Sequence, residues 1–280
     1  MGLASVDAFV KALTNGRKQE WRFVKDGQAA SATPEAAGSW VSLYLDPGSP
    51  AAGTAPTTSW ADFNNGSGSM IFTDVSPQKR YLYAVDICST VAGVVMIYDR
   101  LGHIQTASNA LATASSKTIT AVLPARMTGA ETEDKHNVEA WIELSVATNT
   151  NVVQLSMNSY TDSDGNSGAA GGTLIFPAVA TNVGWMSPLP LAAGDKGVQA
   201  INTINVSVAA ASTGTANIML IRPIAFVPVA AANVMTTISI KDGLIPRRIY
   251  DDSSLCLAWF ATSTTVPDIW GSVVCAYDGS

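Results

Sequence analysis

RYLYAVDICSTVAGVVMIYDR, residues Arg80–Arg100, decides the fold class of this chain. On both sides of a short tip of small residues, hydrophobic side chains recur with the spacing of a β-strand. Three further stretches have the same form: Val138–Tyr160, Ile201–Arg222 and Ser254–Tyr277. We predict that each of the four folds into a β-hairpin, so that the chain is mostly antiparallel β-structure.

The composition points to a folded protein with unusually few charges. Of the 280 residues, 47% are hydrophobic and 14% are charged. A chain of this length can bury a substantial core, but typical domains carry about 25% charged residues. Two interpretations stay open: a neutral surface rich in Ser and Thr, or a surface that is buried against partner subunits.

Strand-like runs separated by loops of Gly, Pro, Ser and Thr predict an all-β fold. We expect an antiparallel, jelly-roll-like β-sandwich in two packed halves, with one short N-terminal helix. The polar stretch 124–137 has no periodicity and is interpreted as the boundary between the halves. The predicted units are a helix and arm (1–30), a first sandwich (31–130) and a second sandwich (131–280).

The clearest helical periodicity lies at the amino end. Ser5 is a candidate N-cap, and four apolar residues follow with the i, i+3, i+4, i+7 spacing of one helical face: Val6, Phe9, Val10 and Leu13. Basic residues come next in a chain of net charge −6: Arg17, Lys18, Arg22 and Lys25. We predict that residues 1–25 form an arm that binds another subunit through these side chains. The alternative is that the helix covers the protein's own sandwich.

No catalytic or metal-binding signature is visible. The two histidines, His103 and His136, have no metal ligand at a suitable spacing, and we expect both at the surface. The three cysteines have no C-x-x-C spacing and are expected to be small core residues: Cys88, Cys256 and Cys275. The chain is therefore expected to be no enzyme and to need no cofactor or metal.

Two patterns were tested as ligand sites. Glu139, Trp141 and Glu143 alternate along a strand and share one face, which suits a glycan-binding surface. The two carboxylates would be about 13 Å apart along the strand, too far for the catalytic pair of a glycosidase. The run 162–166 imitates a calcium loop, but Gly165 stands inside the acidic triplet, so a plain hairpin tip is expected.

Charge and hydropathy exclude two partner classes. A sequence pI near 4.8 argues against nucleic acid as a partner, because such binding depends on Lys and Arg. The apolar run Pro223–Ile240 is interrupted by prolines and polar residues, so we predict a buried strand, turn and strand rather than a membrane span. We expect a soluble protein that is made in a cytoplasm.

Three segments resemble a known group of proteins. They are SVDAFVKALTNGRKQEWRF (5–23), the stretch from NSYTDSDGNSG to MLIRPI (158–224), and the stretch from DGLIPRRIYDDSSLCLAWF to IWGSVVCAYDG (242–279). Together they resemble structural proteins that tailed bacteriophages encode near their head genes.

The resemblance implies a β-sandwich virion protein, made in the host bacterial cytoplasm. It implies a decoration (cement) or minor head protein that binds the major capsid protein or other virion proteins. It also implies a homo-oligomer, with a trimer preferred. It supplies no catalytic residue. The alternative function is a carbohydrate-binding β-sandwich module of a phage fibre or receptor-binding protein.

Overall fold

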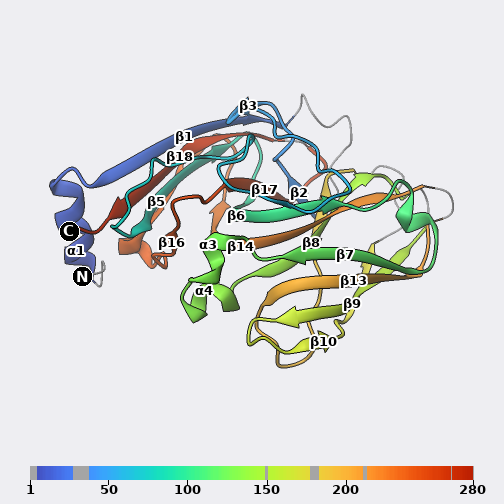
Figure 1. The fold of residues 1–280 in the computed structure, drawn as a ribbon. Coiled ribbons are helices and arrows are strands. Elements are labelled where there is room, and N and C mark those ends of the chain that lie inside the picture. Colours follow the sequence, from blue (N-terminus) through green and yellow to red (C-terminus); the bar gives the residue numbers. More distant parts are fainter. Residues whose placement is uncertain are drawn as a thin grey trace.

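The structure is a computed structural model that describes residues 5–27, 38–148, 151–176, 183–210, 213–265 and 267–279. Residues 1–4 and 28–30 of the predicted arm therefore lie outside the described residues. The molecule has three layers of antiparallel strands (Figure 1). A central ring of strands lies between two smaller sheets, which we call sheet 1 and sheet 2.

The central layer is a closed β-barrel. Its six strands are hydrogen-bonded in the order β14, β8, β12, β2, β17 and β6, and β6 pairs again with β14. A closed ring has no free edge that could pair with another chain. The strands are β2 (Trp40–Ser42), β6 (Gly93–Gln105), β8 (Glu139–Val146), β12 (Trp185–Pro188), β14 (Thr215–Val229) and β17 (Leu255–Ala261), and β4 (Ala61–Asp62) adds to β6.

Two sheets pack against the outside of this barrel. Sheet 1 contains β1 (Lys18–Asp26), β3 (Gly48–Ser49), β5 (Arg80–Ser89), β15 (Thr236–Ser239), β16 (Arg248–Ile249) and β18 (Asp268–Tyr277). Sheet 2 contains β7 (Ser116–Val122), β9 (Val153–Asp162), β10 (Ser167–Ala169), β11 (Thr173–Phe176) and β13 (Val198–Val208). Figure 1 shows β1, β5 and β18 on one side of the barrel strands and β7, β9 and β13 on the other.

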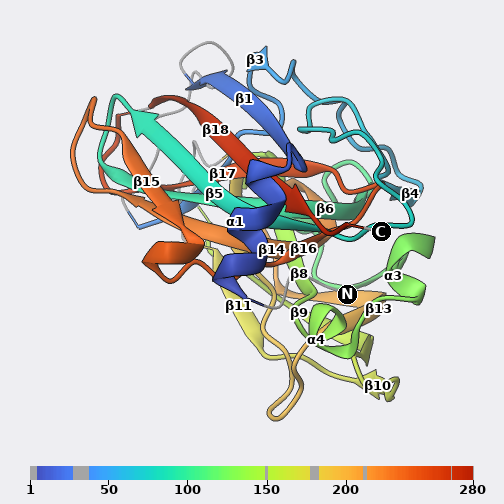
Figure 2. The same ribbon diagram turned by 90° about the vertical axis from the view of Figure 1, so that its left-hand side faces the viewer.

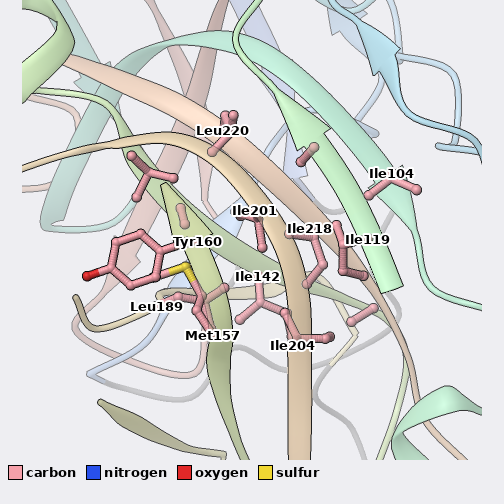
Figure 3. Close-up of a cluster of buried hydrophobic side chains, with 14 of the residues drawn as sticks. Ile104, Ile119, Ile142, Met157, Tyr160, Leu189, Ile201, Ile204, Ile218 and Leu220 are labelled. Atoms are coloured by element: carbon pink, nitrogen blue, oxygen red, sulfur yellow. The ribbon is translucent and has the colours of Figure 1, made fainter. Parts of the chain in front are cut away.

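Three apolar cores result from this layering. The barrel interior is filled by residues such as Met96, Tyr98, Trp141, Met219 and Cys256. Between the barrel and sheet 1 lie Val85, Ile97, Leu257 and Val273, among others. Between the barrel and sheet 2 lie Ile142, Ile204, Ile218 and Leu220, among others (Figure 3). Each fully buried aliphatic side chain contributes about 1.5–3 kcal/mol, so most of the stability comes from these cores.

The barrel strands are buried on both faces. In β6, Val95 and Ile97 pack towards sheet 1, whereas Met96 and Tyr98 project into the barrel. Successive side chains of a strand point to opposite faces. A strand covered on both faces therefore reads as a continuous apolar run, which explains the sequence GVVMIY at residues 93–98.

The four predicted hairpins are wrong in their pairing. Each stretch forms two strands as predicted, but the two strands join different layers: β5 with β6, β8 with β9, β13 with β14, and β17 with β18. We call these units arches. Hairpins favour two-residue turns such as Asn-Gly, and the tips here are longer and lack that signal. A tight hairpin joins β9 and β10, across residues 163–166.

The arches are nested. The first and fourth arches pair with each other in two layers, through β5 with β18 and β6 with β17. The second and third do the same, through β8 with β14 and β9 with β13. The all-β class is confirmed, but strands from 31–130 and 131–280 share every layer. The two halves therefore interleave instead of meeting at residue 130.

The predicted boundary segment folds back onto the barrel as two short helices, α3 (Ala125–Thr128) and α4 (Thr132–His136). The predicted N-terminal helix is confirmed as α1 (Val6–Thr14), and Ser5 Oγ accepts a hydrogen bond from the Ala8 amide at 3.2 Å. Helix α1 lies on the outer face of sheet 1 (Figure 2). Two 3₁₀ turns complete the elements: η1 (Ala110–Ala112) and η2 (Ile240–Asp242).

Candidate functional site

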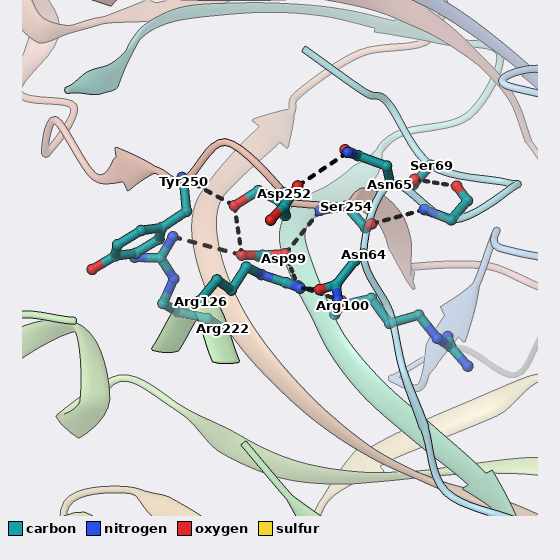
Figure 4. A network of polar contacts seen from close by, with 12 residues as sticks. Asn64, Asn65, Ser69, Asp99, Arg100, Arg126, Arg222, Tyr250, Asp252 and Ser254 are labelled. Carbon is teal, nitrogen blue, oxygen red and sulfur yellow. Dashed lines mark hydrogen bonds and ion pairs between the residues drawn. The ribbon is translucent and has the colours of Figure 1, made fainter. Parts of the chain in front are cut away.

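A buried charged cluster lies on the outer wall of the barrel, between the core with sheet 1 and the core with sheet 2 (Figure 4). Asp99 of β6 and Arg222 of β14 are directly opposite each other, and both are fully buried. On β14, Leu220 belongs to the core with sheet 2, and Ala225 belongs to the core with sheet 1. The charged pair therefore marks the place where one strand passes from one core to the other.

Asp99 accepts hydrogen bonds on both carboxylate oxygens. Arg126 Nη2 and the Ser254 amide donate to Oδ1, each at 3.0 Å, and Ser253 Oγ donates to Oδ2 at 2.8 Å. Arg222 Nη2 lies 3.8 Å from Oδ2. Burying a carboxylate is tolerable only when it is paired and hydrogen-bonded. Asp99 meets that condition through groups from three separate segments.

Arg222 extends the cluster to α4. Its Nη1 donates to Asp134 Oδ1 at 2.7 Å, and its Nη2 donates to the Arg248 carbonyl at 2.6 Å. The Tyr250 hydroxyl donates to Asp134 Oδ2 at 2.7 Å. Burial, with the hydrogen bond to Asp134 as the next cause, raises the pKa of Tyr250. The cluster thus joins the barrel, the helices 125–136 and the segment 248–254.

Sequence reasoning missed this cluster. It treated 124–137 as a boundary, although Arg126 and Asp134 from that segment are the partners of Asp99 and Arg222. The signal was charged residues inside apolar strands: Asp99 and Arg100 in MIYDRLGHI (96–104), and Arg222 in IMLIRPIAF (218–226). Charged residues are rarely buried unless they are paired, so these positions indicated a buried pair.

A second charged cluster lies inside the barrel. Arg100 Nε donates to His103 Nδ1 at 2.9 Å, and Arg100 Nη2 lies 3.7 Å from Glu143 Oε2. The guanidinium carbon is 4.1 Å from the ring centroid of Tyr44. Asn217 Nδ2 donates to Glu143 Oε2 at 2.8 Å. Among the described residues, neither Nη atom of Arg100 has a hydrogen-bond partner, so aromatic contact and the nearby carboxylate replace hydrogen bonds.

His103 was predicted at the surface, and this is wrong. It is buried in the barrel, with its ring centroid 5.1 Å from that of Phe63. Burial, followed by the charge of Arg100, lowers the pKa of His103 to about 3. A neutral imidazole can accept the hydrogen bond from Arg100. Surface placement failed because Gly102 precedes His103 inside a long strand rather than in a turn.

The segment 43–70 closes this end of the barrel. The Tyr44 and Phe63 rings are 5.5 Å apart, and Gly66 lies so close that a Cβ there would be 2.3 Å from the Phe63 ring. Lys25 reaches in from β1 and donates to the carbonyls of Asp46 and Pro50, both at 2.9 Å. Burial raises the pKa of Asp46 to about 7, although the charge of Lys25 opposes this shift.

The opposite end of the barrel is lined by aromatic side chains, and we call it the barrel mouth. The ring centroid of Trp40 lies 5.2 Å from Phe260, 5.9 Å from Phe226 and 6.3 Å from Trp141. These four residues come from four different barrel strands. Phe226 is the most exposed of them, with 51% of its surface accessible.

The Glu139, Trp141 and Glu143 face exists, but it lines the barrel. Trp141 and Glu143 are 3% and 2% exposed, so this face is no open glycan surface. Only Glu139 reaches the mouth, where Trp141 Nε1 donates to its Oε2 at 2.7 Å. Burial raises the pKa of Glu139, and the indole hydrogen bond opposes the rise.

The predicted partner-binding residues divide into buried and exposed groups. Phe9 is buried against Tyr81 and Tyr83 of sheet 1, and Leu13 packs beside it. Val6 and Val10 remain 47% and 38% exposed.

The arm is not detached from the body of the protein. Strand β1 pairs with β18 along its whole length, so Lys18 and Arg22 are exposed residues of sheet 1 and Arg17 is half-buried. The alternative, a helix on the protein's own sandwich, is confirmed. A partner for the exposed residues stays a prediction.

The calcium-like run is a hairpin tip. Asp162 Oδ1 accepts the amides of Asp164 and Asn166 at 2.9 and 2.8 Å, which closes the turn between β9 and β10. Among the described residues, no group of His, Cys, Asp and Glu side chains is arranged to hold a metal ion. His136 Nε2 lies 3.2 Å from Asp164 Oδ1 of this tip.

The described residues contain no membrane-spanning helix: none of the helices there has the length and apolar character needed to cross a membrane.

Among the residues that the structure describes, the outer face of sheet 2 carries no charged residue. Directly paired residues project to the same face of a sheet, so the registers of β7, β9, β11 and β13 define its rows. The outward residues are Ser116, Thr118, Val122, Gln154, Ser156, Thr161, Thr173, Ile175, Ala200, Thr203, Asn205 and Val208. We call this surface the neutral face.

Comparisons with known proteins establish no relative. No family matches the sequence, and no curated protein matches it. Among solved structures, the VP2 subviral particle of infectious bursal disease virus is 10% identical over 93% of this chain, with a TM-score of 0.12. This chain spans 42% of the length of that VP2 chain. The baseplate tripod of bacteriophage Tuc2009 is 10% identical over 85% of this chain and 78% of its own, with a TM-score of 0.13. Scores this low show no common fold.

Proposed function

We propose that this chain is a non-enzymatic structural protein of a virion, a decoration (cement) or minor head protein of a tailed bacteriophage. The resemblance in the segments 5–23, 158–224 and 242–279 supports this role. Its partners are the major capsid protein or other virion proteins, and its copies form a homo-oligomer, with a trimer preferred.

The neutral face is the observation that carries the proposal. In a chain of net charge −6, like charges oppose close approach of acidic partners or of further copies. A flat strand surface of hydroxyl, amide and aliphatic groups has no such opposition. Three exposed apolar residues on it add contact area: Val122, Ile175 and Val208. The rigid barrel behind this face holds it in one shape for repeated contacts on a lattice.

Introducing a charged residue on the neutral face tests whether this face binds the partner. Val122→Glu places a carboxylate on the neutral face, and Val24→Glu is the matched control, because Val24 is an equally exposed valine on an outward position of sheet 1. We expect Val122→Glu to reduce co-sedimentation with particles at least about tenfold, while Val24→Glu binds like the parent. Absence of the chain from purified particles by mass spectrometry and cryo-electron microscopy would contradict the virion role itself.

The exposed side of α1 is the second proposed contact. Val6 and Val10 lie beside buried Phe9, at the exposed edge of the same helical face. We expect Val6→Asp with Val10→Asp to weaken binding to particles without changing the melting temperature of the free protein. Phe9→Ala should do the reverse and lower the melting temperature, since it opens a cavity against Tyr81 and Tyr83. A lower melting temperature for the valine double variant would show an intramolecular role only.

Light scattering tests the oligomer. A mass of 29.1 kDa, that of one chain, at micromolar concentration, together with no assembly on capsids, would contradict the proposed trimer.

The alternative of a glycan-binding fibre module has lost its original support. The Glu139, Trp141 and Glu143 face is inside the barrel, where a glycan chain cannot lie along it. What remains of that chemistry is confined to the mouth.

A further inference from the structure

The barrel mouth combines a concave surface with aromatic and polar groups. A cleft of about 300 Å³ opens beside it, bordered by Pro223 and Phe226 of β14, by Asn137 and Glu139 at the start of β8, and by Ile245 and Arg247. Phe226 belongs both to this cleft and to the ring cluster around Trp40. The mouths of β-barrels are frequent ligand sites.

The barrel mouth is open because β14 extends beyond the last residue that pairs with β8. β8 pairs with β14 only as far as Ile221, opposite Glu139. Beyond that point, residues 223–229 pair with β6 alone, and Ile224 is an extra residue at a bulge in the register. Bulges re-aim side chains next to functional sites. Here the bulge lies between Pro223 and Phe226, which both border the cleft.

Two of the polar groups are held by hydrogen bonds. Glu139 is half-buried, and the Trp141 indole fixes one of its oxygens at 2.7 Å. Asn137 follows α4, and its Nδ2 donates to the Glu133 carbonyl, which leaves the Oδ1 and one N–H of the amide for a ligand; Arg247 precedes the short strand β16. The cleft therefore presents a carboxylate acceptor, an amide that both donates and accepts, and a guanidinium donor around an exposed aromatic ring.

This combination matches the chemistry of a sugar ring. A pyranose has hydroxyl groups around its rim and patches of C–H bonds on its faces. An aromatic ring covers the C–H patch, while carboxylate, amide and guanidinium groups pair with the rim hydroxyls. A cleft near 300 Å³ is at the small end of ligand sites, which suits one or two sugar rings and excludes a helix of a partner protein.

We propose that the barrel mouth binds an uncharged saccharide, with one sugar ring against Phe226 and its hydroxyl groups paired with Glu139, Asn137 and Arg247. An uncharged sugar is favoured because a sugar carboxylate would face Glu139. The proposal is independent of the virion role, since the site is on the barrel and the docking face is on sheet 2.

The test is a titration of the free protein with neutral hexoses and their disaccharides, followed by tryptophan fluorescence and calorimetry. We expect at least one sugar to bind and to shift the fluorescence of the Trp40 and Trp141 pair. Phe226→Ala and Glu139→Gln should each weaken that binding about tenfold or more. Ile175→Ala, which trims an equally exposed apolar residue on the neutral face, should bind the sugar like the parent.

Each other outcome overturns the proposal. No binding by any neutral sugar at millimolar concentration would do so, as would binding that survives both mouth variants. Binding of acidic sugars alone, or of proline-rich peptides in place of sugars, would assign the mouth to a different ligand. Val122→Glu should leave sugar binding unchanged, so failure of the docking proposal and failure of this one remain distinguishable.

Discussion

Asp99 and Arg100 are neighbours in β6, yet they belong to different environments. Asp99 points out of the barrel into a cluster in which both of its oxygens accept hydrogen bonds. Arg100 points into the barrel, where one hydrogen bond, a carboxylate at 3.7 Å and a tyrosine ring surround it. The outer cluster joins separate segments of the chain, whereas the inner one fills a closed space. We infer that the outer cluster matters more for stability.

Asp99→Ala should have the largest effect. It leaves Arg126 and Arg222 buried beside a missing carboxylate, and breaking a buried pair in this way costs about 3–5 kcal/mol. Denaturant unfolding measures the change. The control is Glu131→Gln, which removes an exposed pair with Lys79 and should change the free energy of unfolding by less than about 0.5 kcal/mol. Equal effects from the two variants would show that the outer cluster has no special role.

Glu143→Gln should destabilise less. Gln keeps an oxygen that can accept the hydrogen bond from Asn217, so the main loss is the charge opposite Arg100. We expect about 1.5–3 kcal/mol, the range for interactions with a charged group, again from denaturant unfolding. A loss as large as that of Asp99→Ala would break the comparison between the two sides of β6.

His103 should make the inner cluster sensitive to acid. Its pKa is about 3 in the folded protein, against 6.5 for an ordinary histidine. Between these values the unfolded chain binds a proton and the folded chain does not, so stability falls as pH falls from 6.5 towards 3, by up to about 1.4 kcal/mol per pH unit. His103→Gln should remove this component, because Gln can accept the bond from Arg100. Parallel stability curves for parent and variant over this range would contradict the assignment.

Asp46 should act in the opposite direction and more weakly. Its folded pKa of about 7 lies above the ordinary value of 3.8, so the folded chain binds the extra proton between these values. Stability from this group is therefore present below pH 3.8 and is lost as pH rises towards 7. Asp46→Asn should gain stability relative to the parent at pH 8 compared with pH 5, by up to about 2.7 kcal/mol, because only the folded parent has to release the extra proton over these two pH units. If the variant instead gained stability relative to the parent at pH 5, the pKa of Asp46 would be lowered by folding, which would contradict the assignment.

Local patterns in the sequence were sufficient for strands, the helix and the fold class. The spacing of Phe9 and Leu13 and the cap at Ser5 are local signals, and the structure confirms them. Layer assignment is not local. The strands of Arg80–Arg100 are apolar on both faces, so their sequence fits a hairpin and an arch equally well.

The predictions about the sites failed for the same reason, because the environment of each residue is not a local property of the sequence. The environment of His103 depends on Phe63 and Tyr44, and that of Asp99 depends on Ser254, all distant in sequence. Only lone charges in apolar strands pointed to buried pairs. The sequence pattern of Glu139, Trp141 and Glu143 correctly placed them on one face, but could not show that this face was inside a barrel.

Closure of the barrel is the central claim, and residue-resolved amide hydrogen exchange tests it most directly. β6 is bonded to β17 on one side and to β14 on the other. If the ring is closed, consecutive amides from Val94 to Tyr98 should all exchange slowly, because both edges of the strand are occupied. Fast exchange at every second residue of β6, matched by fast exchange at every second residue of β14 between Asn217 and Ile221, where β8 occupies the other edge, would show an open sheet and contradict the account.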